Sequence, residues 1–220
     1  MFGSLLAVGT SVVIARRLGP ELRGQYGMIL MAASLIAAFG HLGIGAAISY
    51  HTGRRTYPRG EILSFLVAVS LGLGTLLAAV FLAFYDRIPG IWTDIPRPLM
   101  ILGLVAVPFN FLHNFLHRFL LGLLRVAQAN ISRMLHTTLY FALALGIVWL
   151  AGGMLGGVVF ASSASIVLAS VVSLLVFTRD LRPLGRLRLS LLAPFVAYGL
   201  QVYLIFVFNH LNHRFDILLV

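Results

Sequence analysis

The sequence contains no cysteine and no lysine, and only 10% of its 220 residues are charged. The absence of cysteine excludes a disulfide, a thiolate nucleophile and a cysteine-ligated metal site. Soluble domains are about a quarter charged and about half apolar, whereas this chain is 60% hydrophobic with a mean hydropathy of +1.00. The composition therefore predicts a protein that resides in a membrane.

All 16 basic residues are arginine, and with six acidic residues they give a formal net charge of +10. Such an excess can indicate nucleic-acid binding. However, no arginine-rich run interleaved with aromatic residues stands outside the apolar segments. Basic residues that flank membrane spans and meet anionic lipid explain the charge better. We expect membrane lipids as partners and no nucleic acid.

Apolar runs of about 20 residues, long enough to cross a bilayer as helices, recur along the chain. They predict an all-α fold, a polytopic membrane helix bundle with six complete transmembrane helices plus a partial seventh. A glycine-rich turn from Gly152 to Gly157 joins the fifth and sixth runs, which should form an antiparallel hairpin. The runs cover approximately residues 1–16, 26–50, 62–85, 98–124, 135–151, 154–178 and 191 to the terminus.

Arginines are distributed unevenly among the connections between these runs. Ten follow the second, fourth and sixth runs, namely Arg54, Arg55, Arg59, Arg118, Arg125, Arg133, Arg179, Arg182, Arg186 and Arg188. Five follow the first and third runs, namely Arg16, Arg17, Arg23, Arg87 and Arg97. Because cytoplasmic loops carry the excess of arginine, this predicts a cytoplasmic N-terminus. Met1 and Val220 both lie inside apolar segments, so we also expect a piece of a longer transporter.

Four polar residues in the fourth run, Asn110, His113, Asn114 and His117, fall within one narrow stripe of a helix at about 100° per residue. Facing lipid, each would be desolvated without a partner. The stripe therefore predicts contact with protein or a water-filled cavity, and it makes the chain a candidate transporter. The histidines have the i, i+4 spacing of zinc ligands, but no carboxylate lies nearby, so we expect no metal.

The last apolar run carries a second polar face, formed by Gln201, Asn209, Asn212, His213 and Asp216, with His210 and Arg214 beside it. A carboxylate at membrane depth costs a few kcal/mol and is rarely without a role. One interpretation is a cation or proton site, or the lining of a hydrophilic cavity. The other is an Asp216–Arg214 or inter-helix pair that locks the packing.

The sequence shows no carrier of enzymatic chemistry. It contains no glycine-rich phosphate loop, no nucleophile–base pair and no acid pair suited to hydrolysis. We therefore expect a protein that is not an enzyme and has no cofactor.

The run from Val12 to Tyr26 resembles the first-helix motif of bacterial polysaccharide (O-antigen type) flippases, in the multidrug/oligosaccharidyl-lipid/polysaccharide exporter superfamily. The motif residues are Arg16, Leu18, Gly19, Pro20, Gly24 and Tyr26. Three further runs are similar to later parts of that family, namely Phe39 to Gly53, Leu121 to Asn130 and Asn212 to Val220. The resemblance follows the chain in order from end to end.

The resemblance implies two pseudo-symmetric bundles, with residues 1–188 as the N-terminal bundle and residues 189–220 as the start of the second. It implies a glycan on a polyprenyl diphosphate as substrate, carried across the bacterial inner membrane by alternating access. Arginine suits a diphosphate. A polysaccharide polymerase or a glycosyltransferase would be a possible partner. The chain departs from a richly cationic cavity, because its first six runs have no clear arginine at mid-membrane.

Two other functions remain open at this point. A multidrug or cation antiporter of the same superfamily would need carboxylates inside the first bundle, and the first six runs contain none away from their ends. A non-transporting membrane subunit of a polysaccharide assembly complex would use the polar stripes as protein contacts.

Overall fold

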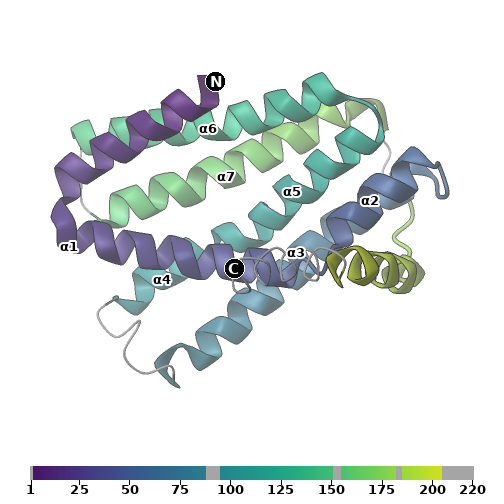
Figure 1. Ribbon diagram of the computed structural model, residues 1–220, viewed down its shortest axis with the longest axis horizontal. Helices are drawn as coiled ribbons and strands as arrows, with labels where there is room; N and C mark the ends of the chain where they lie inside the picture. Colours follow the sequence, from purple (N-terminus) through teal and green to yellow (C-terminus); the bar gives the residue numbers. More distant parts are fainter. Residues whose placement is uncertain (1, 88–94, 151–154, 182–184, 205–220) are drawn as a thin grey trace, which may run out of the picture.

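The computed structural model describes residues 2–87, 95–150, 155–181 and 185–204, and within these ranges every regular element is helical (Figure 1). The long elements are α1 (Phe2–Gly40), α2 (Ile44–Gly53), α3 (Arg59–Phe84), α4 (Arg97–Leu104), α5 (Ala106–Gly122), α6 (Val126–Leu150) and α7 (Leu155–Phe177). Short 3₁₀ turns are η1 (Tyr85–Arg87), η2 (Arg179–Leu181) and η3 (Leu189–Leu191), the last of which opens the helix Leu189–Leu204. The predicted all-α fold is confirmed.

Five stretches of the described chain are long and apolar enough to cross a membrane, which is the pattern of a multi-pass membrane protein. They are Leu5–Gly40, Arg59–Arg87, Arg97–Gly122, Val126–Trp149 and Leu155–Phe177. The helix Leu189–Leu204 is apolar but shorter.

Helix α1 consists of two arms that meet at Gly19, and Figure 1 shows that the arms run in different directions. Gly19 has φ 71° and ψ 175°, a left-handed conformation that glycine adopts at no steric cost. Pro20 disfavours the helical conformation at the residue before it and fits the first turn of the second arm, where its missing N–H is not needed. The Leu-Gly-Pro sequence therefore makes the bend, and the predicted runs 1–16 and 26–50 both begin in α1.

Two predicted runs are interrupted in the structure. Run 26–50 breaks between α1 and α2, where Leu42 and Gly43 both have positive φ. Run 98–124 breaks at Val105, between α4 and α5. Pro108 causes this second break, because it has no N–H for the carbonyl of Leu104 and its ring crowds that carbonyl.

The predicted start of the fifth run near Leu135 is wrong, since α6 begins at Val126. The first two turns of α6 carry polar residues, and a search for apolar runs misses them. Leu124, with φ 61°, provides the left-handed turn that separates α5 from α6. Helices α6 and α7 lie side by side, as the predicted hairpin requires.

Helix α5 runs through the middle of the bundle. It packs against α2, α3, α6 and α7. Phe111, Phe115 and Phe119 on this helix are at most 1% exposed, and Leu112 and Leu116 are buried as well. Because α5 is covered on several sides, some of its polar residues, such as the buried His113, also meet protein.

The ends of α2, α5 and α7 lie at one end of the bundle, which we call the basic end; it carries Arg54, Arg55, Arg59, Arg125, Arg179 and Arg188. There Arg125 donates to the carbonyl of Phe177 and pairs with Asp180. The N–H of Gly185 donates to the carbonyl of Gly60 over 3.1 Å. The connections after the second, fourth and sixth predicted runs therefore meet at this end.

The opposite end carries its own contacts. Arg97 at the start of α4 pairs with Asp86 of η1 over 3.3 Å. The phenol of Tyr85 donates to the carbonyl of Ile95 over 2.6 Å. These contacts join the end of α3 to the start of α4.

The helix Leu189–Leu204 packs on α2 through aromatic rings and two glycines. The rings of Tyr50 and Tyr198 stack with centroids 4.4 Å apart. Gly43 and Gly199 bring the two backbones into contact, since a Cβ on Gly43 would lie 2.1 Å from the Gly199 carbonyl oxygen. No side chain fits at this crossing.

Candidate functional site

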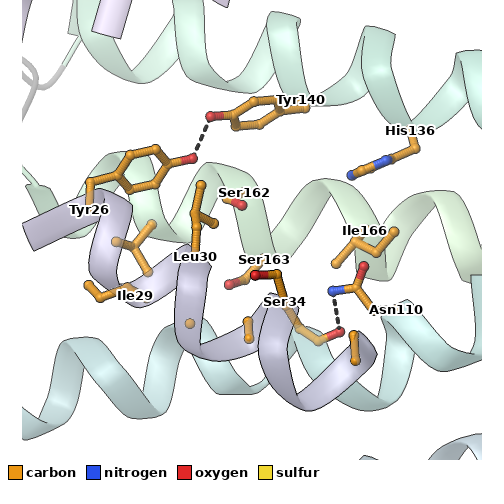
Figure 2. A pocket seen from close by; sticks show the side chains of 15 residues that line it. Tyr26, Ile29, Leu30, Ser34, Asn110, His136, Tyr140, Ser162, Ser163 and Ile166 are labelled. Carbon is orange, nitrogen blue, oxygen red and sulfur yellow. Dashed lines mark hydrogen bonds between the residues drawn. The ribbon is translucent and has the colours of Figure 1, made fainter. Parts of the chain in front are cut away.

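A cavity of about 410 Å³ lies between the second arm of α1, α4, α5, α6 and α7, and it is partly open, because Leu30 and Ser34 in its lining are exposed (Figure 2). Seven of the side chains that line it are polar: Tyr26, Ser34, Asn110, His136, Tyr140, Ser162 and Ser163. The others are small or aliphatic: Ile29, Leu30, Ala33, Ala37, Gly103, Ala106, Val159 and Ile166. Among these lining residues there is no arginine and no carboxylate. The cavity therefore contains polar groups on a largely apolar wall, and none of these groups is charged.

The two tyrosines of the cavity come from distant parts of the chain. Tyr26 lies two turns beyond the Gly19 bend, which turns the second arm of α1 back across the bundle. Tyr140 lies on α6, and the two phenol oxygens share a hydrogen bond of 2.5 Å. Figure 2 shows the two rings meeting above Ser162 of α7. This bond ties α1 to α6 at the cavity wall.

Asn110 and His136 present unused hydrogen-bonding groups to the cavity. The Asn110 Nδ2 donates to the carbonyl of Ala106 over 3.1 Å, which leaves its Oδ1 without a donor among the described residues. The His136 ring has no hydrogen bond within the described part of the protein. In Figure 2 both side chains point into the space beside Ile166. A polar ligand or water in the cavity would satisfy them.

Serines of α7 hold this helix in place, and two of them, Ser162 and Ser163, line the cavity. Ser163 donates to the carbonyl of Leu102 over 2.8 Å, and Ser170 donates to the carbonyl of Phe109 over 3.0 Å. These bonds hold α7 against α4 and α5. The α7 side of the cavity is therefore held in place by hydrogen bonds from serine side chains to backbone carbonyls.

A histidine and arginine cluster extends from the cavity towards the basic end. His136 lies beside the buried His113, with ring centroids 5.6 Å apart. One turn further along α5, the His117 Nε2 accepts a hydrogen bond of 2.8 Å from Arg133. The His117 Nδ1 then donates to the carbonyl of Ala129 over 3.1 Å. Protein groups occupy both nitrogens of His117, which leaves it no lone pair for a metal.

The structure separates the four residues of the predicted stripe. Asn110 lines the cavity, His113 is buried behind it, and His117 is half-buried at the α5–α6 contact. Asn114 is exposed, and its Nδ2 donates to the carbonyl of Asn110 over 2.9 Å. Among the described residues, no group of three or more histidines, cysteines or carboxylates could hold a metal.

The predicted residues of the last run lie mostly outside the described part of the chain. Gln201 is exposed on the helix Leu189–Leu204. Asn209, Asn212, His213, Arg214 and Asp216 lie outside the described residues.

The motif residues of the first run occupy three kinds of position. Leu18 is buried, and Gly19 and Pro20 make the bend of α1. Arg16 and Gly24 are exposed. Tyr26 lines the cavity and is 7% exposed. The motif therefore shapes the chain so that its last residue reaches the cavity.

Sequence reasoning did not single out Ser34, His136, Tyr140, Ser162 or Ser163. One signal was present, because His136 and Tyr140 are spaced i, i+4 and so share a face of α6. The serines of α7 also recur at helical spacing. These patterns resemble ordinary small-residue packing, and only the fold shows that they meet Asn110 and Tyr26.

The family model described as polysaccharide biosynthesis protein matches the chain over residues 1–220, its whole length. Comparison with curated proteins gives no match, and comparison with solved structures gives none either. The matched range includes every helix that lines the cavity and the whole run from Arg16 to Tyr26.

Proposed function

We propose, since the chain belongs to the polysaccharide biosynthesis protein family, that it is a transporter that flips a polyprenyl-diphosphate-linked oligosaccharide. Transfer would run from the cytoplasmic to the outer face of a bacterial inner membrane. The family match over the whole chain carries this proposal, because this family suggests a flippase or exporter role. The polar cavity inside an apolar helix bundle supports it, since polar groups at membrane depth are costly and mark transport pathways.

In this proposal each arm of α1 crosses the membrane separately. The first arm, Phe2 to Leu18, would be roughly 25 Å long, close to the thickness of the hydrocarbon core. The second arm would continue through α2 to complete the second span. With α3, α4 and α5 together, α6 and α7, this gives six complete spans, and the helix Leu189–Leu204 would start a seventh. Residues 1–188 would then form the first bundle and residues 189–220 the start of a second.

The basic end would face the cytoplasm and receive the diphosphate. Arginine forms paired, charge-assisted hydrogen bonds with phosphate oxygens. Arg214 and Asp216 would contribute to the pathway, the first to phosphate binding and the second to coupling. Rocking of one bundle against the other would then expose the substrate to the outer face.

The described carboxylates favour this function over a cation antiporter. Glu21, Asp86 and Asp180 are exposed near helix ends, and Glu61 pairs with Arg188 at the basic end. None of these four lines the cavity. An antiporter that binds an organic cation would need a carboxylate near its ligand.

Reconstitution of the full-length protein in liposomes tests the proposal. A fluorescent lipid-linked oligosaccharide is placed in both leaflets, and a membrane-impermeant reagent quenches the outward-facing fraction over time. We expect quenching to become complete with protein and to stop near half without it. If quenching stopped near half in liposomes with the protein as well as in those without it, the result would contradict flipping.

One pair of variants and two alternative outcomes sharpen this assay. Asp216→Asn should lower the flipping rate, whereas Asp86→Asn, a matched loss of one acidic charge in η1, should not. Transport of a cationic dye without transport of the glycan would instead favour the antiporter. Loss of polysaccharide assembly in cells without any flipping in liposomes would favour the non-transporting subunit.

A further inference from the structure

The cavity has a chemical character that differs from that of the basic end. Its polar lining consists of hydroxyl, amide and imidazole groups, and none of its described lining residues is an arginine or a carboxylate. Arg133 lies one turn from His136 but is engaged with His117. An anion such as a diphosphate would therefore be desolvated here without a countercharge, at high cost.

The free groups of the cavity suit a ligand that both donates and accepts hydrogen bonds. The Asn110 Oδ1 accepts and the His136 ring offers one donor and one acceptor when neutral, whereas the hydroxyls of Ser34 and Ser163 already donate to backbone carbonyls and keep only their capacity to accept. The rings of Tyr26 and Tyr140 add apolar faces beside these groups. Sugars combine hydroxyl groups with apolar C–H faces in the same way.

The cavity is also of limited size. Ligand pockets in proteins range from about 300 to 1,000 Å³, so a volume of about 410 Å³ lies near the small end. Its volume is suited to one unit of the glycan, and the rest of a lipid-linked oligosaccharide would extend beyond it.

We infer that this cavity binds one uncharged sugar unit of the transported glycan, through Asn110, His136 and the tyrosine pair, while the diphosphate is bound elsewhere. The inference rests on the proposed function, since it assigns a part of that substrate to this site. The first bundle would thereby recognise the sugar unit, and charged groups outside the cavity would bind the diphosphate that links the glycan to the lipid.

Two asparagines on α5 provide a matched pair of variants. Asn110 and Asn114 lie one turn apart, and each donates its Nδ2 to the backbone carbonyl four residues earlier. Asn110 lines the cavity and Asn114 does not. Asn110→Ala and Asn114→Ala therefore remove the same local bond, and only the first removes an acceptor from the cavity.

Saturation-transfer NMR on the full-length protein in nanodiscs measures the binding of free sugars. The neutral probes are glucose, galactose and N-acetylglucosamine, and the charged probes are glucuronate and inorganic pyrophosphate. We expect saturable binding of at least one neutral sugar. Asn110→Ala should weaken it about threefold to tenfold, the loss expected for one hydrogen bond, and Asn114→Ala should leave it unchanged.

Three results would overturn the inference. They are no binding of any neutral sugar to the wild-type protein, equal binding by wild type and Asn110→Ala, or displacement of the neutral sugar by pyrophosphate or glucuronate. The flipping assay is run on the same preparation to separate the two hypotheses. Flipping without sugar binding rejects the sugar site alone, and sugar binding without flipping rejects the proposed transport alone.

Discussion

The phenol of Tyr26 on α1 is hydrogen-bonded to the phenol of Tyr140 on α6, 114 residues further along the chain. This bond closes one side of the cavity and depends on the bend at Gly19, because a straight α1 would carry Tyr26 away from α6. A motif at one end of the chain thus positions a cavity residue.

Replacing both tyrosines tests whether this bond stabilises the bundle. Tyr26→Phe and Tyr140→Phe each remove one hydroxyl and keep the ring in place. We expect each to lower the free energy of unfolding by about 0.5–1.5 kcal/mol, and the double variant to lose less than the sum of the two. Reversible unfolding in mixed micelles measures all four proteins. Strictly additive effects would show that the two phenols do not interact.

The contact between Gly43 and Gly199 should tolerate no side chain. Gly43→Ala places a methyl group 2.1 Å from the Gly199 carbonyl oxygen and adds a left-handed alanine, which alone costs about 1–2 kcal/mol. We expect a clear fall in the midpoint of thermal unfolding in detergent. Gly72→Ala is the matched control, because open space surrounds Gly72 in the middle of α3. It should raise stability by about 0.5–1 kcal/mol, and a similar loss in both variants would contradict the close contact.

The Arg125–Asp180 pair should make stability depend on acidic pH. The hydrogen bond from Arg125 holds the pKa of the Asp180 carboxyl below its usual value. A lowered pKa in the folded state gives a stabilisation that is complete above the ordinary aspartate pKa, about 4, and is lost as the pH falls through the lowered value. Since Asp180 is half exposed, the contribution should stay below about 1 kcal/mol.

Comparison of wild type with Asp180→Asn measures this contribution. The two thermal midpoints should differ at pH 6 and converge at the lowest pH at which the protein stays folded. Arg125→Gln should lower the midpoint at pH 6 by at least as much, because it also removes the hydrogen bond to the Phe177 carbonyl, and adding Asp180→Asn to it should lower the midpoint no further. A difference that persists unchanged at low pH would mean that Asp180 acts through something other than its charge.

Hydrophobic run length predicted the all-helical fold, because burial in a bilayer leaves a helix as the way to satisfy the backbone. The same measure missed the breaks at Gly43 and Val105 and placed the start of α6 too late. The two breaks depend on local backbone chemistry, and the early start of α6 depends on two polar helical turns. A hydropathy average over about 20 residues is insensitive to such local features.

The candidate site was predictable in part. The cost of burying an amide pointed to Asn110, which does line the cavity. The same argument grouped it with Asn114, which is exposed, because a stripe defined by angle alone does not show which neighbours cover it. Tyr140 and Ser163 could not be assigned, since their role comes from contact with residues far away in sequence.

The orientation of the bundle in the membrane can be tested with single cysteines, because the natural chain has none. Arg55 and Asp86 are exposed at opposite ends of α3, the first at the basic end and the second in η1. Arginine-rich connections remain in the cytoplasm. We therefore expect a membrane-impermeant maleimide to label Asp86→Cys in intact spheroplasts, and to label Arg55→Cys only after the membrane is opened. If Arg55→Cys were labelled in intact spheroplasts and Asp86→Cys only after opening, the orientation would be the opposite one, with the basic end outside. The arginines there would then meet the glycan lipid after transfer and could not receive it from the cytoplasm.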